Sequence, residues 1–190
     1  VWKAGMGSVK ARDVLEKIES YRVRIPEFNP DIWVYNTILD TAIKHGEPNA
    51  HELGEEMIQS LMHGRLENPM ARPDTITFTI AIDALAKSGA SDAPQRAEAL
   101  LQQMKDLTAN GWHGLKPNMK TYSTVMSAWA NSRQPGAAQR AEMLLKESPE
   151  PNAISFNTVM DAWSKSQSRD APEHAEALLM EMEELSNDES

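Results

Sequence analysis

Apolar residues recur along this 190-residue chain at the spacing i, i+3, i+4 and i+7, which is typical of the buried face of an amphipathic helix. Four such stripes begin at an aromatic residue: Tyr35/Ile38/Leu39/Ala42, Phe78/Ala81/Ile82/Leu85, Tyr122/Val125/Met126/Trp129 and Phe156/Val159/Met160/Trp163. A second stripe follows each of them: Gly54/Met57/Ile58/Leu61, Ala97/Leu100/Leu101/Met104, Ala141/Leu144/Leu145 and Ala175/Leu178/Leu179/Met182. One more stripe, Ala11/Val14/Leu15/Ile18, precedes them all. The pattern predicts paired amphipathic helices, with an incomplete pair at the start of the chain.

A short motif opens every first stripe and sets the register of the pairs. It reads Pro-(Asp/Asn)-x-x-x-(Tyr/Phe)-(Asn/Thr/Ser) and begins at Pro30, Pro73, Pro117 and Pro151, with successive copies 43, 44 and 34 residues apart. The second residue after each of these prolines lies 22 residues before the start of the second stripe every time. This period predicts an all-α fold, an α-solenoid of stacked helical hairpins. We expect a single array over residues 1–190, with units at 1–31 (truncated), 32–74, 75–118, 119–152 and 153–190.

The boundaries of the helices carry their own signals. Asp92 ahead of Pro94, and Asp170 ahead of Pro172, predict second helices that start with a capping side chain. Residues 1–5 resemble the end of a helix already under way, so we expect a fragment of a longer chain.

Composition limits the possible chemistry. The chain has no cysteine, which excludes disulfides, thiolate metal sites and thiol nucleophiles. No apolar run approaches the ~20 residues of a membrane-spanning helix. Five histidines (His45, His51, His63, His113, His174) show no metal-ligand spacing, and the single pair of His51 and Glu55 on one helix face is typical of a surface. We therefore expect no enzyme, no cofactor and no metal in these residues, while an appended nuclease domain beyond them stays open.

The formal net charge of −9 argues, taken alone, against a nucleic-acid partner. The predicted first helices (32–45, 75–88, 119–132 and 153–166) nevertheless sum to +1. The negative charge is concentrated in the second helices and the tail, at Glu55, Glu56, Glu98, Glu142, Glu176, Glu181, Glu183 and Glu184. We expect these glutamates to form a solvated outer layer, and the tryptophans Trp129 and Trp163 to be core residues only.

The four motifs resemble the start of the repeat in the pentatricopeptide repeat family, Pro-Asp-x-x-(Thr/Ser)-(Tyr/Phe)-Asn-x-(Leu/Ile). Thr77, Thr121 and Ser155 stand before the aromatic as in the family, and Val34 departs from it. The Ala-Glu-x-Leu-Leu segments 97–101, 141–145 and 175–179 match the second helix of the family repeat. The signature of tetratricopeptide repeats is absent. The resemblance covers essentially the whole chain and implies a right-handed superhelix.

The resemblance implies binding of single-stranded RNA, with one base per repeat read by two or three side chains. The first reading position, directly after the aromatic, is occupied by Asn36, Thr79, Ser123 and Asn157. The second position follows the next proline and is occupied by Asp31, Asp74, Asn118 and Asn152. The complete pairs are Asn36/Asp74, Thr79/Asn118 and Ser123/Asn152. The base-stacking position, three residues before each first reader, holds Trp33, Ile76, Lys120 and Ile154.

In the family's usage these pairs imply the bases U-A-A, with a pyrimidine next at Asn157. A residue directly after the core aromatic is rotated by ~100° from the buried face, so a short polar side chain there projects from the first helix. Lys44, Lys87 and Lys165 lie on the same face and are candidates for phosphate contacts. The alternative for them is a weak i,i+4 pair with Asp40, Asp83 and Asp161.

The resemblance also implies a mitochondrial or plastid protein that acts in RNA processing, stability or translation. A rival hypothesis is a helical-repeat scaffold that binds protein in its groove or on its acidic outer face and makes no RNA contact. A peptide groove does not require an Asn, Thr or Ser matched with an Asp or Asn at the same positions of every repeat. These matched pairs therefore favour RNA as the partner.

Overall fold

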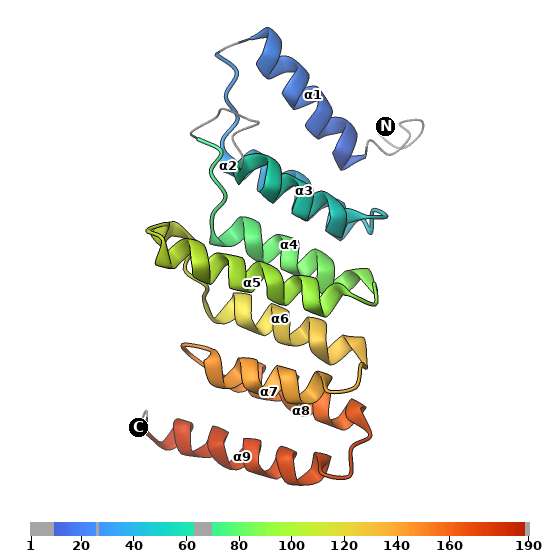
Figure 1. The fold of residues 1–190 in the computed structure, drawn as a ribbon, viewed down its shortest axis with the longest axis vertical. Helices are drawn as coiled ribbons and strands as arrows, with labels where there is room; N and C mark the ends of the chain where they lie inside the picture. Colours follow the sequence, from blue (N-terminus) through green and yellow to red (C-terminus); the bar gives the residue numbers. More distant parts are fainter. Residues whose placement is uncertain (1–9, 26, 63–69, 189–190) are drawn as a thin grey trace, which may run out of the picture. The chain divides into compact units, whose positions relative to one another are not determined.

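The computed structural model describes residues 10–25, 27–62 and 70–188 (Figure 1). Helices joined by turns and loops make up this part of the chain, and no strand occurs in it. The elements are α1 (Ala11–Arg24), α2 (Ile32–Lys44), α3 (Ala50–Met62), α4 (Thr75–Ser88), α5 (Ala93–Ala109), η1 (His113–Leu115), α6 (Met119–Ser132), α7 (Ala137–Glu147), α8 (Ala153–Ser166) and α9 (Ala171–Asp188). The predicted all-α hairpin fold is confirmed, and each predicted stripe lies on its own helix. The expected helix end at residues 1–5 falls outside the described residues.

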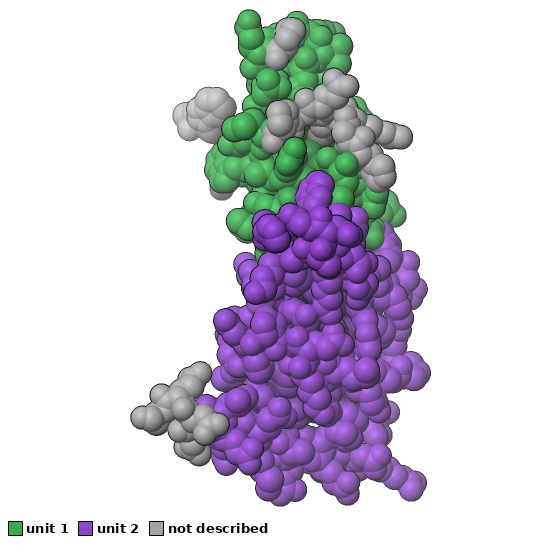
Figure 2. All heavy atoms as spheres, turned by 60° about the vertical axis from the view of Figure 1, so that its left-hand side comes forward, with its two compact units in different colours: residues 1–84 green, residues 85–190 purple. Residues whose placement is uncertain are grey.

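The chain divides into two compact units, residues 1–84 and residues 85–190, with the boundary inside α4 (Figure 2). In the first unit, α2 packs against both α1 and α3. In the second unit, α5 packs on α6, α6 packs on α7 and α8, and α8 packs on α7 and α9. Within each unit, the helices of these pairs are therefore neighbours in space, as expected for helical repeats.

The apolar stripes form the core of each unit. Tyr35, Leu39 and Ala42 of α2 are almost fully buried in the first unit, and Met126 and Trp163 are almost fully buried in the second. Gly54 stands where the other second helices have alanine. A Cβ built there would lie 3.1 Å from the Ala81 Cβ, so close packing of α3 on α4 explains the glycine.

The ends of the first helices repeat one backbone conformation. Gly46 and Gly89 adopt positive φ at this position, and Arg133 (φ 53°) and Gln167 (φ 55°) adopt it at the equivalent place after α6 and α8. At the last residue of α4, α6 and α8, a serine hydroxyl donates to the carbonyl three residues back. This shared ending fixes the direction in which each chain segment leaves the first helix.

The predicted capping by Asp92 is wrong. Asp92 precedes α5 and Pro94 lies in its first turn, but the Asp92 side chain accepts no capping hydrogen bond. Its carboxylate instead pairs with Arg96 at 3.5 Å. Asp92 has φ −98° and ψ 0°, outside the extended conformation that points a cap residue's oxygen at the first turn.

Candidate nucleic-acid interface

The residue after each motif proline is the N-cap of a first helix. Asp31, Asn118 and Asn152 have extended backbones, and the side-chain oxygen of each accepts a hydrogen bond from the backbone nitrogen three residues on. In Asp74, Oδ1 accepts from the Thr77 nitrogen at 2.8 Å and from the Thr77 hydroxyl at 2.9 Å. The predicted second readers are therefore held in place by helix capping.

A hydroxyl before the aromatic completes the capping box. The backbone nitrogens of Asn118 and Asn152 donate to Thr121 Oγ1 and Ser155 Oγ, and both of those residues are buried. Val34 carries no hydroxyl, so the capping box is not completed at Asp31, whose carboxylate accepts from the Val34 nitrogen at 3.3 Å. The Thr/Ser position of the motif thus has a structural role that the sequence alone did not indicate.

One predicted reader pair is brought into contact within the first unit. Asn36 on α2 and Asp74 at the start of α4 lie 38 positions apart in the chain, and Asn36 Nδ2 donates to Asp74 Oδ1 at 3.4 Å. Asn36 is 7% exposed, and its Oδ1 is buried with no hydrogen-bond partner among the described residues. A buried amide oxygen without a partner is rare because it loses its hydration without compensation.

The other predicted first readers have different surroundings. The Thr79 hydroxyl donates to the Thr75 carbonyl at 2.7 Å, and the Ser123 hydroxyl donates to Met119 Sδ at 3.4 Å. Asn157 is exposed on α8. Within the described residues no hydrogen bond joins Ser123 to its predicted partner Asn152. Thr79 and Asn118 belong to different compact units, so neither unit by itself contains that pair.

Large apolar side chains are exposed at the predicted stacking positions. Trp33 is 69% exposed, Ile76 59% and Ile154 66%, and Lys120 is exposed at the same place on α6. Exposed side chains of this size, at the same position of each first helix, provide flat or aliphatic surfaces against which a base can stack.

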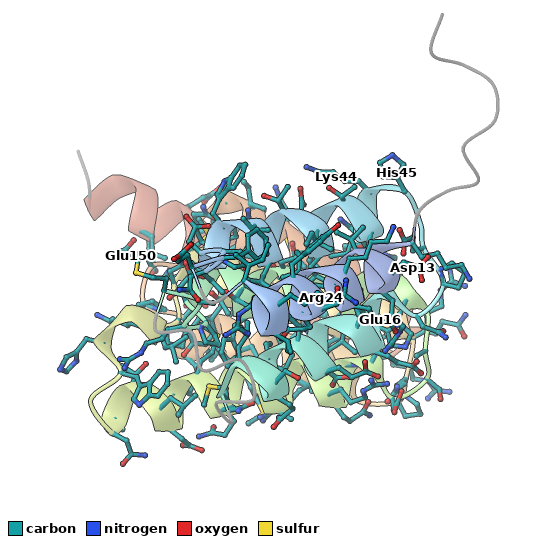
Figure 3. The ribbon with its side chains drawn as sticks, turned by 90° about the horizontal axis from the view of Figure 1, so that it is seen from above. Asp13, Glu16, Arg24, Lys44, His45 and Glu150 are labelled. Carbon is teal, nitrogen blue, oxygen red and sulfur yellow. The ribbon has the colours of Figure 1, made fainter. Side chains whose placement is uncertain are left out.

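The predicted phosphate-contacting lysines lie at the ends of the first helices. Figure 3 shows Lys44 projecting from α2 on the side away from α3. Lys44 pairs with Asp40, and Lys165 pairs with Asp161, each across one helical turn. Lys87 is exposed at the equivalent position on α4. The i,i+4 pairs considered as an alternative are thus present at Lys44 and Lys165, and the role of the lysines toward phosphate stays a prediction.

Residues 100–166 match a family model described as the pentatricopeptide repeat domain. The matched segment runs from the stripe of α5 to the end of α8 and contains Asn118, Ser123, Asn152 and Asn157. Residues 100–166 of this chain form a pentatricopeptide repeat domain. No curated protein matches it at a significant level.

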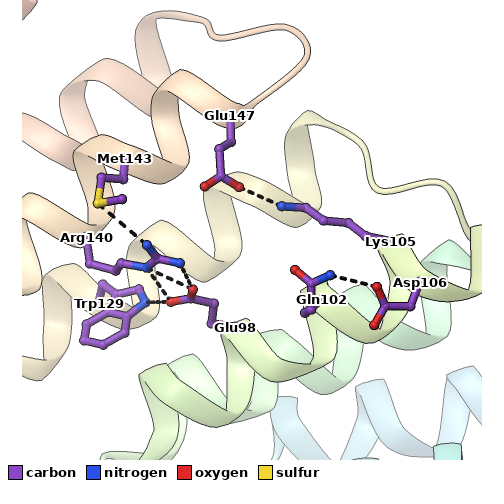
Figure 4. A network of polar contacts seen from close by, with 8 residues as sticks. All are labelled: Glu98, Gln102, Lys105, Asp106, Trp129, Arg140, Met143 and Glu147. Carbon is purple, nitrogen blue, oxygen red and sulfur yellow. Dashed lines mark hydrogen bonds and ion pairs between the residues drawn. The ribbon is translucent and has the colours of Figure 1, made fainter. Parts of the chain in front are cut away.

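The second helices α5 and α7 are joined by a network centred on Glu98 (Figure 4). The Trp129 indole nitrogen donates to Glu98 Oε2 at 3.0 Å, and the Arg140 guanidinium binds both carboxylate oxygens. Hydrogen bonds from Arg140, against the opposing effect of burial, hold the pKa of Glu98 below its ordinary value. Nearby, Lys105 pairs with Glu147 at 2.7 Å and its ammonium lies 5.2 Å from the centre of the Tyr122 ring.

The same arrangement recurs one hairpin later around Glu142. Its carboxylate accepts from Trp163 at 2.9 Å and from Lys146 at 2.9 Å, and it lies 2.9 Å from His174, whose ring stacks on Trp163. Burial raises the pKa of Glu142, but the hydrogen bonds from Lys146 and Trp163 outweigh it and hold that pKa below its ordinary value.

The expectation of a solvated outer layer is therefore wrong for Glu98 and Glu142. Their side chains are 22% and 14% exposed and bridge neighbouring hairpins. The tryptophans are likewise more than core, since each indole nitrogen donates to a glutamate. The sequence contained a signal for these bridges. The residue directly before the next Ala-Glu segment is Arg140 in the unit after Glu98 and His174 in the unit after Glu142.

Other kinds of site find no support in the part of the chain that the structure describes. Within residues 10–25, 27–62 and 70–188, no group of three or more acidic or histidine side chains could hold a metal ion. None of the helices described there has the length and apolarity needed to cross a bilayer.

Proposed function

We propose that this protein binds single-stranded RNA in a sequence-specific manner, one base per repeat, and acts by binding and not by catalysis. The observation that supports this proposal best is the contact of Asn36 with Asp74. The sequence paired these two residues only through their positions in successive copies of the motif. Together they leave a buried amide oxygen without a partner among the described residues, which a base donor would satisfy.

The chemistry of each pair supports a base preference. Uracil presents an N3–H donor between two carbonyl acceptors, whereas adenine presents the N1 acceptor beside an amino donor. Asp74 has only acceptors to offer, which suits uracil. Asn118 and Asn152 use Oδ1 for capping, which leaves the Nδ2 donor of each for N1 of adenine. The proposed target is therefore U-A-A, followed by a pyrimidine at Asn157.

The exposed stacking positions support the same proposal. Trp33, Ile76 and Ile154 would lie against the faces of successive bases, and Lys120 would do so with its alkyl stem. Lys44, Lys87 and Lys165 would share their charges between nearby aspartates and the phosphates. In this proposal the five segments form one array that works on RNA in a mitochondrion or plastid, in processing, stability or translation.

The reading proposal is tested by changing one pair of readers. Fluorescence anisotropy would compare wild type with the Thr79→Asn/Asn118→Asp variant on single-stranded RNAs containing U-A-A or U-U-A. Aspartate also caps helices well, so α6 is expected to keep its start. The preference of the variant should move toward U-U-A by about 1 kcal/mol or more, roughly a fivefold change in relative affinity.

Thr41→Asn on α2 serves as a matched threonine-to-asparagine control outside the readers, and its preference should equal that of wild type. An unchanged preference in the double variant would overturn the code. Failure to bind any of the RNAs, together with binding of a peptide, would favour the protein-binding scaffold instead.

A further inference from the structure

The first unit contains a cavity of about 320 Å³ between α1, α2 and α3. Its apolar floor is formed by Leu15, Tyr35, Leu53 and Met57, and its remaining lining is Arg12, Glu16, Glu19, Glu56 and Ser60. Three carboxylates against one guanidinium leave the lining two charges negative. In Figure 3, Glu16 lies between the ribbons of α1 and α3, in agreement with its place in this lining.

The equivalent place in the second unit is filled by side chains of the chain itself. The register of the repeat aligns α1, α2 and α3 with α5, α6 and α7, so that Glu19 corresponds to Lys105 and Ser60 corresponds to Glu147. Lys105 lies there over the Tyr122 ring and pairs with Glu147. At the α1–α3 junction, glutamate replaces the cation and serine replaces its partner, while Tyr35 keeps the aromatic ring.

Two more exchanges open the same junction. Trp129, whose indole bridges to Glu98, corresponds to Ala42, and Arg140 corresponds to Leu53. The large side chains that close the α5–α7 junction are thus replaced by small or apolar ones. The cavity follows from these substitutions, since the helices keep their register while the filling groups are missing.

The carboxylates of the cavity differ in how far they are already neutralised. Glu56 pairs with Arg12 at 2.7 Å, and Glu19 pairs with Arg22 at 3.2 Å. Tyr35 donates its hydroxyl to Glu19 at 3.4 Å, and burial together with the Glu19 charge raises the pKa of Tyr35 to about 12. Glu16 forms no hydrogen bond or ion pair within the described residues. The site therefore retains negative charge above an apolar floor.

We propose that this cavity binds a lysine or arginine side chain from a basic segment of a partner protein. The alkyl stem would lie on Leu15, Leu53 and Met57, and the cation would lie near the Tyr35 ring beside Glu16 and Glu19. The internal Lys105 shows that this fold accommodates a cation with an aliphatic stem at this position. The net negative charge of the lining gives the complementarity to a basic segment. This protein-binding site is separate from the proposed RNA readers and does not depend on them.

The test uses the 190-residue protein and a fluorescein-labelled ten-residue peptide in which lysine alternates with glycine and serine. Binding is measured by anisotropy, and its place is measured by the NMR shift of the Met57 methyl group. We expect the peptide to bind and to move the Met57 signal. A peptide with every lysine acetylated keeps the stem without the charge and should bind at least about tenfold more weakly, a difference of about 1.4 kcal/mol.

Two variants probe the cavity itself. Glu16→Gln should weaken binding by about threefold to fivefold, the usual range for one partly exposed ion pair. The Glu19→Lys/Ser60→Glu variant rebuilds the Lys105–Glu147 bridge inside the cavity and should weaken binding by about tenfold or more. Because that variant exchanges the Glu19–Arg22 ion pair for the new bridge, its thermal midpoint is measured beside that of wild type, and binding is compared at a temperature at which both proteins are folded.

Glu184→Gln on the exposed face of α9 is the matched control, because it changes the net charge by the same amount as either cavity variant. Equal losses in Glu184→Gln and the cavity variants would reduce the binding to general charge attraction and overturn the proposal. A Met57 signal that does not move while the peptide binds would overturn it too.

Discussion

At the scale of single residues, three positions of the Pro-(Asp/Asn) motif have three different structural roles. The Asp or Asn caps the helix, the Thr or Ser completes the capping box, and the aromatic fills the core. Only the residue after the aromatic has no structural duty of this kind. Asn36 meets Asp74 there and keeps one buried oxygen without a partner among the described residues. This division would allow the predicted reading positions Asn36, Thr79, Ser123 and Asn157 to vary while the fold is kept.

Glu98 provides a residue-scale prediction on pH. Its pKa is lowered in the folded state, so it stabilises the fold above the pKa of the unfolded chain, and this contribution is lost as the pH falls through the lower folded pKa. Glu98→Gln should reduce the free energy of unfolding at pH 7 by about 1–2 kcal/mol, as expected for hydrogen bonds to a charged group. Urea titrations from pH 7 down to pH 3 should show this difference shrinking below about pH 4.5.

The control for this prediction is Glu184→Gln, in which an exposed glutamate of α9 is changed in the same way. It should leave both the stability and its pH dependence near wild type. A Glu98→Gln difference that stays constant from pH 7 to pH 3 would contradict the assignment of the effect to the Glu98 charge.

At the scale of the helical elements, the hairpins share one register but not one set of junction contacts. Trp129 and Arg140 close the junction of α5, α6 and α7 around Glu98, and Trp163 and His174 do the same around Glu142 one hairpin later. The α1–α3 junction has lost these groups and contains a cavity. Equivalent positions thus serve packing in one hairpin and leave a potential binding site in another.

The helix ends give an element-scale prediction on stability. Arg133 and Gln167 adopt the left-handed conformation in which a Cβ is unfavourable by roughly 1–2 kcal/mol, whereas two other first helices have glycine there. Arg133→Gly should therefore raise the free energy of unfolding by about 0.5–1 kcal/mol after the added entropy of the unfolded chain is subtracted. The urea midpoint at constant m-value measures this change.

The reverse substitution, Gly89→Ala, provides the control. It should lower the free energy of unfolding by about 1 kcal/mol because the φ of Gly89 is +69°. Nothing lies within 4 Å of the added methyl group, so this cost comes from the backbone conformation and not from a clash. A lower urea midpoint for Arg133→Gly would mean that the Arg133 side chain contributes more than its backbone strain costs.

At the scale of the whole molecule, charge is distributed by helix type. The first helices are nearly neutral, and the chain carries −9 mainly through its second helices and tail. Two of these glutamates are paired with cations, Glu98 with Arg140 across a hairpin junction and Glu142 with Lys146 within α7, so the acidity is less accessible than a count of residues indicates. If the first helices form the proposed reading face, their near-neutral charge favours readout by hydrogen bonds and stacking over attraction to phosphates.

A weak salt dependence of RNA binding is the corresponding prediction. If Lys44, Lys87 and Lys165 alone meet phosphates, the slope of log K against log salt should be no steeper than about −2 for single-stranded RNA. Anisotropy titrations with the U-A-A RNA between 50 and 200 mM potassium chloride measure it. Changing the three lysines to glutamine should bring the slope close to zero.

A variant that loses three positive charges in the α1 segment instead, at Lys10 just before the helix and at Lys17 and Arg24 on it, should keep the wild-type slope. A slope much steeper than −2 in wild type would show that other cations reach the RNA.

The sequence by itself determined the helices, their pairing and the positions of the candidate readers. The apolar spacing and the repeated motif are local signals, because each can be recognised within the sequence of a single helix. The misjudgements made from sequence at Glu98 and Glu142 concern side chains whose role depends on a neighbour far away in the chain, whereas Asp92 fails as a cap because of its own backbone conformation. Only the tertiary structure decided that Asn36 meets Asp74, that two glutamates bridge hairpins and that a cavity opens beside Leu53. The physical reason is that periodicity specifies which face of a helix is buried, whereas contacts between hairpins depend on the size and charge of every group that meets there.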